Sequence, residues 1–179
     1  MGDVIELDPV DTLGAGAIGQ PGERSFFIQA GKDGARLTVL VEKEQVALLA
    51  TEAVAFLDRL ADDFPDEGAE PDASEADVHE PAIPLFRARM IGIGFEPDRR
   101  LVLLELRENS DEEEDEDVAD EDDVADEDDD GFVARIYATR SQVRAMAARG
   151  AAAVAAGRPT CPLCEQPMDP SGHRCPRWN

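Results

Sequence analysis

The sequence predicts an α+β fold in which two βββα-like halves share one antiparallel sheet with two helices. The first observation is that segments rich in β-branched and aromatic residues precede a segment of helical periodicity. The second is that this order occurs twice along the chain. The third is that residues 39–46 align with residues 136–143, since both place a basic residue before the helix and Gln-Val at its start. We therefore expect one duplicated domain over residues 1–158 and a separate tail over residues 159–179.

The first half begins with a short strand at residues 4–7. Glycines are frequent in residues 14–22, which we expect to be a flexible connection. Residues 25–30 and 36–41 form a hairpin by their β-branched and aromatic content. Apolar residues then recur at spacings of three and four, so a helix is expected over residues 44–63, ending before a proline.

The second half repeats this order around a long insertion. Residues 85–95 and 100–106 are expected to form a hairpin. A strand over residues 132–139 should pair with residues 100–106 despite the residues between them. The last helix is expected over residues 141–156, with Ser141 as its N-cap.

Two acidic segments account for the formal charge of -24. Sixteen of the twenty residues between 111 and 130 are Asp or Glu, and nine more acids lie between 62 and 80. Such segments have too few apolar residues to offset the entropy of ordering, so we expect residues 62–82 and 108–131 to be disordered. A net acidic chain is a poor general nucleic-acid binder, because phosphate binding needs clustered Lys and Arg, so nucleic acid is not an expected partner.

Four potential metal ligands are grouped near the C-terminus: Cys161, Cys164, His173 and Cys175. A Cys-x-x-Cys pair forms a knuckle that places two sulfurs on one ion. The residues after it contain Pro and Gly, which favour a turn that brings His173 and Cys175 back to the first pair. Three thiolates and one imidazole form a closed structural set, so Zn²⁺ is the expected cofactor. The alternatives are free thiols in an unfolded tail and a redox-active Cys-x-x-Cys. An odd, clustered set of cysteines indicates a reducing compartment. Together with the absence of a signal peptide or an apolar run of membrane-spanning length, this indicates a cytoplasmic protein without membrane association.

Arginines of the second half could form a patch for an anionic ligand or partner, and the alternative is an ordinary solvated surface. The candidates are Arg87, Arg89, Arg135, Arg140 and Arg144. No catalytic constellation is evident, because the only other histidine, His79, lies in an acidic linker. Residues 14–19 match G-x-G-x-x-G but do not open a helix, which excludes a phosphate-binding loop.

Four pieces of the chain resemble an actinobacterial family described only as a "repeat protein", a domain of unknown function with a similar C-terminal tail. The matching pieces are residues 24–29, 41–46, 157–164 and 168–177. The resemblance implies an internal duplication. Members of that family are often encoded near a histidine-phosphatase-like protein and a phosphatidylinositol-kinase-like protein, which implies these as partners. It implies no catalytic residues.

These observations favour a zinc-binding, non-enzymatic interaction or adaptor module in the cytoplasm. The alternative is an enzyme, or an enzyme subunit, that acts on a phosphorylated small molecule through the arginine-rich face. Convergence of those arginines on one concave pocket beside a carboxylate such as Glu105 would favour the enzyme.

Overall fold

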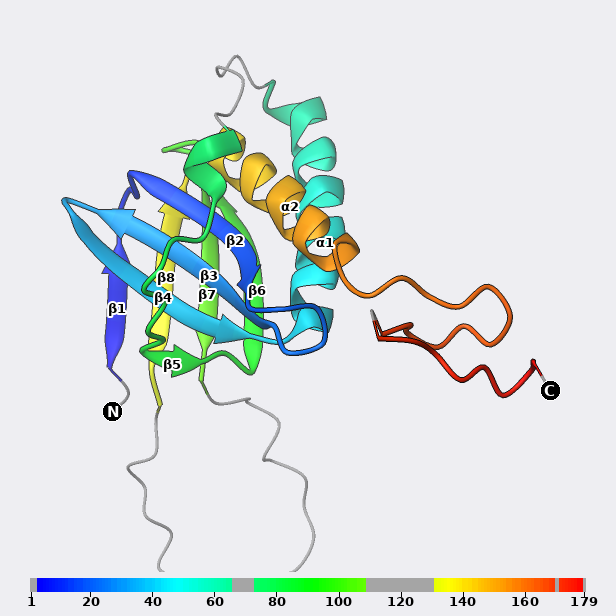
Figure 1. Cartoon of the computed structure of the whole chain (residues 1–179). Helices are drawn as coiled ribbons and strands as arrows, with labels where there is room; N and C mark the ends of the chain where they lie inside the picture. Colours follow the sequence, from blue (N-terminus) through cyan, green and yellow to red (C-terminus); the bar gives the residue numbers. More distant parts are fainter. Residues whose placement is uncertain (1–2, 66–72, 109–130, 170, 179) are drawn as a thin grey trace, which may run out of the picture.

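The computed structural model describes residues 3–65, 73–108, 131–169 and 171–178. Figure 1 shows two sheets, with two helices side by side along one side of them. In chain order the elements are β1 (Val4–Leu7), β2 (Thr12–Ile18), β3 (Ser25–Lys32), β4 (Ala35–Val41), α1 (Lys43–Asp63), a 3-10 helix η1 (Ala73–Ala76), β5 (Phe86–Arg87), β6 (Met90–Glu96), β7 (Leu101–Arg107), β8 (Val133–Ala138) and α2 (Arg140–Ala155). The α+β class is thus confirmed.

The two halves form two four-stranded sheets, so the expectation of one shared antiparallel sheet is wrong. The first sheet has the order β2-β3-β4-β5, and the second has the order β1-β8-β7-β6. Strands within each half pair antiparallel, whereas β1 joins β8 and β5 joins β4 in parallel. Within each half, three strands pair antiparallel, and one edge of the last strand, β4 or β8, has no partner from the same half.

That free edge is filled by a short strand from elsewhere in the chain. β1 precedes the first half but pairs with the last strand of the second, and β5 precedes the second half but pairs with the last strand of the first. The hydrogen bonds at the two junctions match. Val10 N–H donates to the Tyr137 carbonyl and Ala88 N–H donates to the Leu40 carbonyl, each at 2.9 Å. The two halves therefore hold each other through reciprocal strand pairing.

The glycine-rich residues 14–22 are not a flexible connection, because most of them belong to strand β2. The glycines of β2 permit close packing on its outer face. A Cβ at Gly14 would lie 2.5 Å from the Ala76 carbonyl oxygen, and one at Gly16 would lie 3.2 Å from a Val78 methyl. On the opposite face, Ala15 faces α2, since a Cβ added at Gly150 would lie 3.5 Å from the Ala15 Cβ. β2 thus lies between η1 with its following residues and α2.

The first acidic segment is partly folded, which corrects the expectation of disorder over residues 62–82. Asp62 and Asp63 belong to α1, and Ala76 of η1 is only 1% exposed. The backbone of His79 makes reciprocal bonds with the Gln29 side chain, at 2.8 and 2.9 Å, on the outer face of β3. These contacts bury β3 on both faces. Residues 66–72 of this segment, and residues 109–130 of the second one, lie outside the described residues.

Helix α2 begins one residue earlier than expected, and its N-cap is Thr139 rather than Ser141. The Thr139 hydroxyl accepts from the Gln142 N–H, while the Gln142 side chain accepts from the Thr139 N–H. Thr139 has the extended backbone of an N-cap (φ -71°, ψ 157°), whereas Ser141 already lies in the first turn of the helix. A reciprocal pair of this kind satisfies two helix-end donors.

One apolar core lies between both sheets and both helices. The second sheet shows a regular alternation, because Val102, Leu104 and Leu106 of β7 are fully buried while the residues between them are partly exposed. The expected pairing of β7 with β8 is confirmed by six antiparallel residue pairs. Among the described residues, none beyond α2 belongs to this core cluster, so the described part of the tail lies outside it.

Candidate metal centre

The tail turns back on itself immediately after Cys161. The Cys161 N–H donates to the Gln166 carbonyl and the Glu165 N–H donates to the Cys161 carbonyl, both at 2.8 Å. Glu165 has φ of +61°, the left-handed conformation that reverses the chain. An isolated bridge between Thr160 and Pro167 closes the turn. This knuckle places the Cys161 and Cys164 side chains on the same side.

A second turn returns His173 and Cys175 to the knuckle. Asp169 and Gly172 form an isolated bridge, with the Gly172 N–H donating to the Asp169 carbonyl at 3.1 Å. Gly172 has φ of +125°, which favours glycine. Beyond this turn the Trp178 N–H donates to the Cys175 carbonyl at 3.1 Å. Both ligand pairs are thus held by backbone hydrogen bonds.

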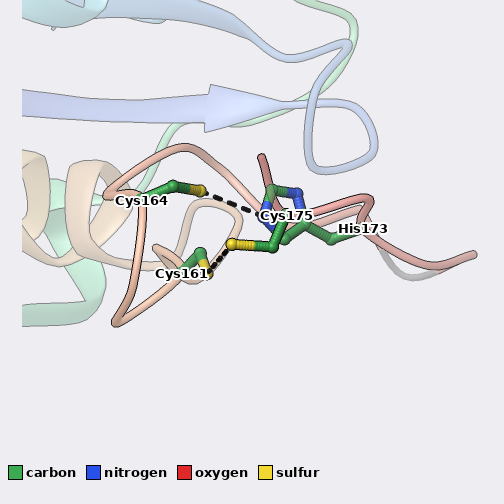
Figure 2. A group of neighbouring side chains, drawn as sticks. All are labelled: Cys161, Cys164, His173 and Cys175. Atoms are coloured by element: carbon green, nitrogen blue, oxygen red, sulfur yellow. Dashed lines mark hydrogen bonds between the residues drawn. The ribbon is translucent and has the colours of Figure 1, made fainter. Parts of the chain in front are cut away.

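Figure 2 shows the four side chains pointing toward one another. All four potential ligand atoms lie within 4.8 Å of one another. The Cys161 and Cys175 sulfurs are 3.9 Å apart, and the Cys164 sulfur is 3.2 Å from His173 Nε2. A tetrahedral ion with metal–sulfur bonds of about 2.3 Å requires sulfurs roughly 3.8 Å apart. The separations therefore fit one ion bound by all four residues.

The thiols differ in acidity because their surroundings differ. Backbone N–H groups of Cys164 and Leu163 hydrogen-bond to the Cys161 sulfur and lower the pKa of that thiol to about 6. The Gln166 N–H acts in the same direction on Cys164, but burial and the sulfurs of Cys161 and Cys175 raise the pKa of Cys164. A metal ion that binds all three sulfurs must therefore displace protons from the cluster.

The tail is held by a contact with Arg158, the residue just before it, and by contacts within the tail itself. Cys161 is 5% exposed, while the other three residues of the cluster are partly exposed. Arg158 donates to the Asp169 carboxylate at 2.5 Å, and Arg177 donates to the Leu163 carbonyl at 3.0 Å. Two apolar side chains of the tail face solvent, since Leu163 is 48% and Trp178 81% exposed.

The arginines predicted to form one anion-binding face are distributed over separate sites. Arg87 pairs with Glu42, Arg135 with Glu105, and Arg144 with Asp58. The Arg89 N–H donates to the Arg107 carbonyl. Glu105 is already bound by two arginines, because Arg107 and Arg135 donate to its two oxygens at 2.8 and 2.9 Å. The described residues therefore do not show the convergence around Glu105 that would favour an enzyme.

Arg140 has a structural position rather than a surface one. It is 5% exposed, donates to the carbonyl of Phe64 at the end of α1, and lies 4.9 Å from the centre of the Phe95 ring. Phe64 and Phe95 also pack together, with ring centroids 5.1 Å apart. Arg140 thus links the start of α2 to the end of α1 and to β6.

A pocket of about 340 Å³ lies between the first sheet, the start of α1 and the tail. Of the five predicted arginines, Arg87 contributes to its lining. Three other basic residues line it that the sequence did not single out: Arg24, Lys43 and Arg158. They come from three distant segments, and no spacing in the sequence connects them.

No helix among the described residues combines the length and the apolar character that crossing a membrane requires. Comparison with known proteins found no match among curated proteins and none among solved structures. The model of one protein family, "Protein of unknown function (DUF3090)", matches residues 5–175, which includes both halves and all four residues of the Cys/His cluster. The chain belongs to the DUF3090 family.

Proposed function

We propose that Cys161, Cys164, His173 and Cys175 bind one structural Zn²⁺ ion. The mutual approach of the four ligand atoms within 4.8 Å carries this proposal. Thiolate and imidazole ligands suit zinc, and a set of four protein ligands leaves no open position for substrate. Zinc would supply a cross-link that fixes the two turns of the tail.

Metal analysis of the purified chain tests the ion. We expect about one zinc per chain, as a four-ligand site implies. Cys164→Ser should lose most of the zinc while the melting transition of the core stays in place, because none of the tail residues that the structure describes belongs to the core cluster. Ser171→Ala, an exposed change in the same tail, serves as the control and should keep the zinc. A chain purified without chelator that contains no zinc would refute the proposal and favour free thiols.

We further propose that the protein is a cytoplasmic, non-enzymatic interaction or adaptor module whose zinc-stabilised tail contacts the partner. The support is the exposure of Leu163 and Trp178 on a tail held by its own hydrogen bonds. Exposed large apolar side chains are common anchors at protein interfaces. The resemblance to the actinobacterial "repeat protein" family names two candidate partners, a histidine-phosphatase-like and a phosphatidylinositol-kinase-like protein.

Co-purification with each candidate partner tests the adaptor role. The tagged wild-type chain should retain a partner. Trp178→Ala should retain at least about tenfold less of it, because one aromatic anchor of the contact is lost. Arg59→Gln, an exposed change on α1, should retain it normally. Equal retention by the wild type and Trp178→Ala would exclude the tail as the contact surface. Turnover of a phosphorylated small molecule by the purified chain would instead establish the enzyme alternative.

A further inference from the structure

We propose that the pocket between the first sheet, α1 and the tail is a binding site for a small organic phosphate. This site goes beyond the proposed zinc centre and uses different side chains. Its basic residues lie just before β3, at the start of α1, in β5 and between α2 and the tail, namely Arg24, Lys43, Arg87 and Arg158.

The charge of the pocket is opposite to that of the chain. Four basic residues and one acidic residue, Glu42, line it, whereas the whole chain carries a formal charge of -24. Clusters of one sign in a concave surface concentrate their field inside it. The pocket is therefore a local site of attraction for anions.

Two of these cations, Arg24 and Lys43, both lie beside Gly157. A Cβ at Gly157 would lie 3.0 Å from Arg24 Nη2 and 3.7 Å from Lys43 Nζ, so the two nitrogens are no further apart than the sum of those distances. The other terminal nitrogen of Arg24 donates to the Ala153 carbonyl at 2.8 Å, which fixes the guanidinium. Within the described parts of the chain, neither Arg24 nor Lys43 has an acidic ion-pair partner. A bound anion would relieve the repulsion between them.

The other two cations can turn to a ligand at small cost. Arg87 pairs with Glu42 and Arg158 pairs with Asp169, and the side chains of both pairs are between 31% and 58% exposed. Exposed pairs of this kind contribute only about 0–1 kcal/mol. A phosphate offers guanidinium groups a bidentate acceptor, which a single surface carboxylate matches less well.

The wall of the pocket indicates an ester rather than free phosphate. Phe26, Leu40, Val41 and Pro167 line it, and the partly exposed Leu40 and the exposed Pro167 offer most of its apolar surface, because Phe26 and Val41 are more than nine-tenths buried. Arg24 lies 5.2 Å from the centre of the Phe26 ring, so the cationic and apolar surfaces adjoin. A ligand with a phosphate group and a small apolar body matches both surfaces.

Calorimetric titration of the full-length, purified chain with phenyl phosphate tests the site. We expect saturable binding of one molecule per chain, and no saturable binding of phenol, which has the same ring without the charge. Lys43→Gln should weaken binding at least about tenfold, as the loss of one charge-assisted hydrogen bond implies. Lys43→Arg should restore most of the affinity, and Arg59→Gln, an exposed charge removal elsewhere on α1, should leave it unchanged.

Each contrary result overturns the proposal. Absence of saturable phenyl phosphate binding excludes the site, equal binding of phenol excludes recognition of the phosphate, and equal weakening by Arg59→Gln reduces the effect to net charge. Zinc content is measured on the same sample. The binding result counts at any zinc content, because Arg24, Lys43 and Arg87 lie outside the tail that the zinc would stabilise. A failure of the zinc centre is therefore distinguishable from a failure of this pocket.

Discussion

Glu105 is the centre of a three-residue ion network on the outer face of the second sheet. Arg135 and Arg107 each donate to one of its oxygens, and Arg135 is its directly opposite neighbour on β8. The hydrogen bond from Arg135 has the largest effect on the pKa of Glu105, Arg107 adds to it, and the pKa is lowered from its ordinary value of 4.5 despite partial burial. Cross-strand pairs of opposite charge stabilise a sheet in this way.

This network makes a pH-dependent contribution to stability. Because the pKa of Glu105 is lower in the folded chain, the contribution is complete above 4.5 and is lost as the pH falls through the folded pKa. We expect Glu105→Gln to lower the free energy of unfolding by about 1 kcal/mol at pH 7. The difference from wild type should shrink in acid, at a pH well below 4.5. Urea unfolding at both pH values measures this.

An exposed acid without a described ion pair provides the control for that experiment. Glu52→Gln on α1 should leave the free energy of unfolding near the wild-type value at neutral pH. A Glu105→Gln effect that stays constant with pH would show that side-chain shape, rather than charge, is responsible.

The strand β2 depends on small residues because both of its faces are covered. Gly14 and Gly16 face residues 76–78, and Ala15 faces α2. A Cβ at Gly14 meets a backbone oxygen at 2.5 Å, and backbone cannot move aside as a flexible side chain can. The glycines therefore set the distance between β2 and the segment that covers it.

We expect Gly14→Ala to lower the free energy of unfolding by about 2 kcal/mol, a usual cost of overpacking. Gly94→Ala on β6 is a matched control, since the nearest atom to its added Cβ lies at 4.0 Å. That variant should be neutral or slightly more stable, because alanine restricts the unfolded chain. Thermal and urea unfolding of both variants compare them. Equal stability of the two would mean that residues 76–78 do not pack on β2 as described.

The helix starts show how one side chain can connect an element to the other half. Gln45 lies in the first turn of α1 and Gln142 in the first turn of α2. The Gln45 amide donates to the carbonyls of Ala88 and Arg89, and the Gln142 amide donates to those of Val10 and Asp11. Each glutamine thus caps its own helix and also holds the residues just after the exchanged strand. This dual role accounts for the glutamine that the two halves share, while the valine that follows it is a buried core residue in both helices.

At the scale of the whole molecule, the reciprocal pairing of β1 and β5 connects the two halves into one unit. Neither half contains all strands of a sheet, because each sheet includes one short strand that directly precedes the other half in the chain. The core is likewise continuous across both sheets and both helices. We therefore expect the described residues between 3 and 158 to unfold in one cooperative transition.

The acidic insertion between β7 and β8 provides a test at this scale. The Glu108 N–H donates to the Phe132 carbonyl at 2.9 Å, so the two strands remain paired up to the ends of the insertion. Deleting residues 111–130 and closing the gap with a short Gly-containing turn should leave the fold intact and the melting temperature equal or higher. Closing a shorter loop costs less by about 0.6 kcal/mol for each halving of its length.

The charge of the insertion adds to that expectation. Removal of 16 carboxylates relieves their mutual repulsion, so the gain in melting temperature should be largest at low ionic strength. Melting curves at low and high salt measure this. Loss of cooperative unfolding in the deletion variant would show instead that the insertion is a structural part of the fold.

The sequence by itself determined the features that depend on neighbouring residues. Both hairpins and both helices follow from local periodicity, and the structure confirms that they exist. The expected first strand of the second hairpin, residues 85–95, is wrong in its first part, because residues 86–87 form β5 in the other sheet and β6 begins at Met90. The four residues of the Cys/His cluster were also identified, because they lie within 15 positions and their side chains need only two turns to meet. The hydrophobic period and the spacing of the metal ligands depend only on residues that are close in sequence, so they can be recognised in a single sequence.

Only the tertiary structure decided the features that depend on distant partners. The free edge of β8 could pair with several strands, and nothing near it in the sequence selects β1. The glycines of β2 indicate a loop when the sequence alone is considered. In the structure they belong to a strand, because α2 and residues 76–78 pack so closely on it that only small residues fit. The basic pocket likewise joins Arg24, Lys43, Arg87 and Arg158 from four segments. These contacts are set by the packing of the whole chain, because the free energy gained by burying surface does not depend on separation in sequence.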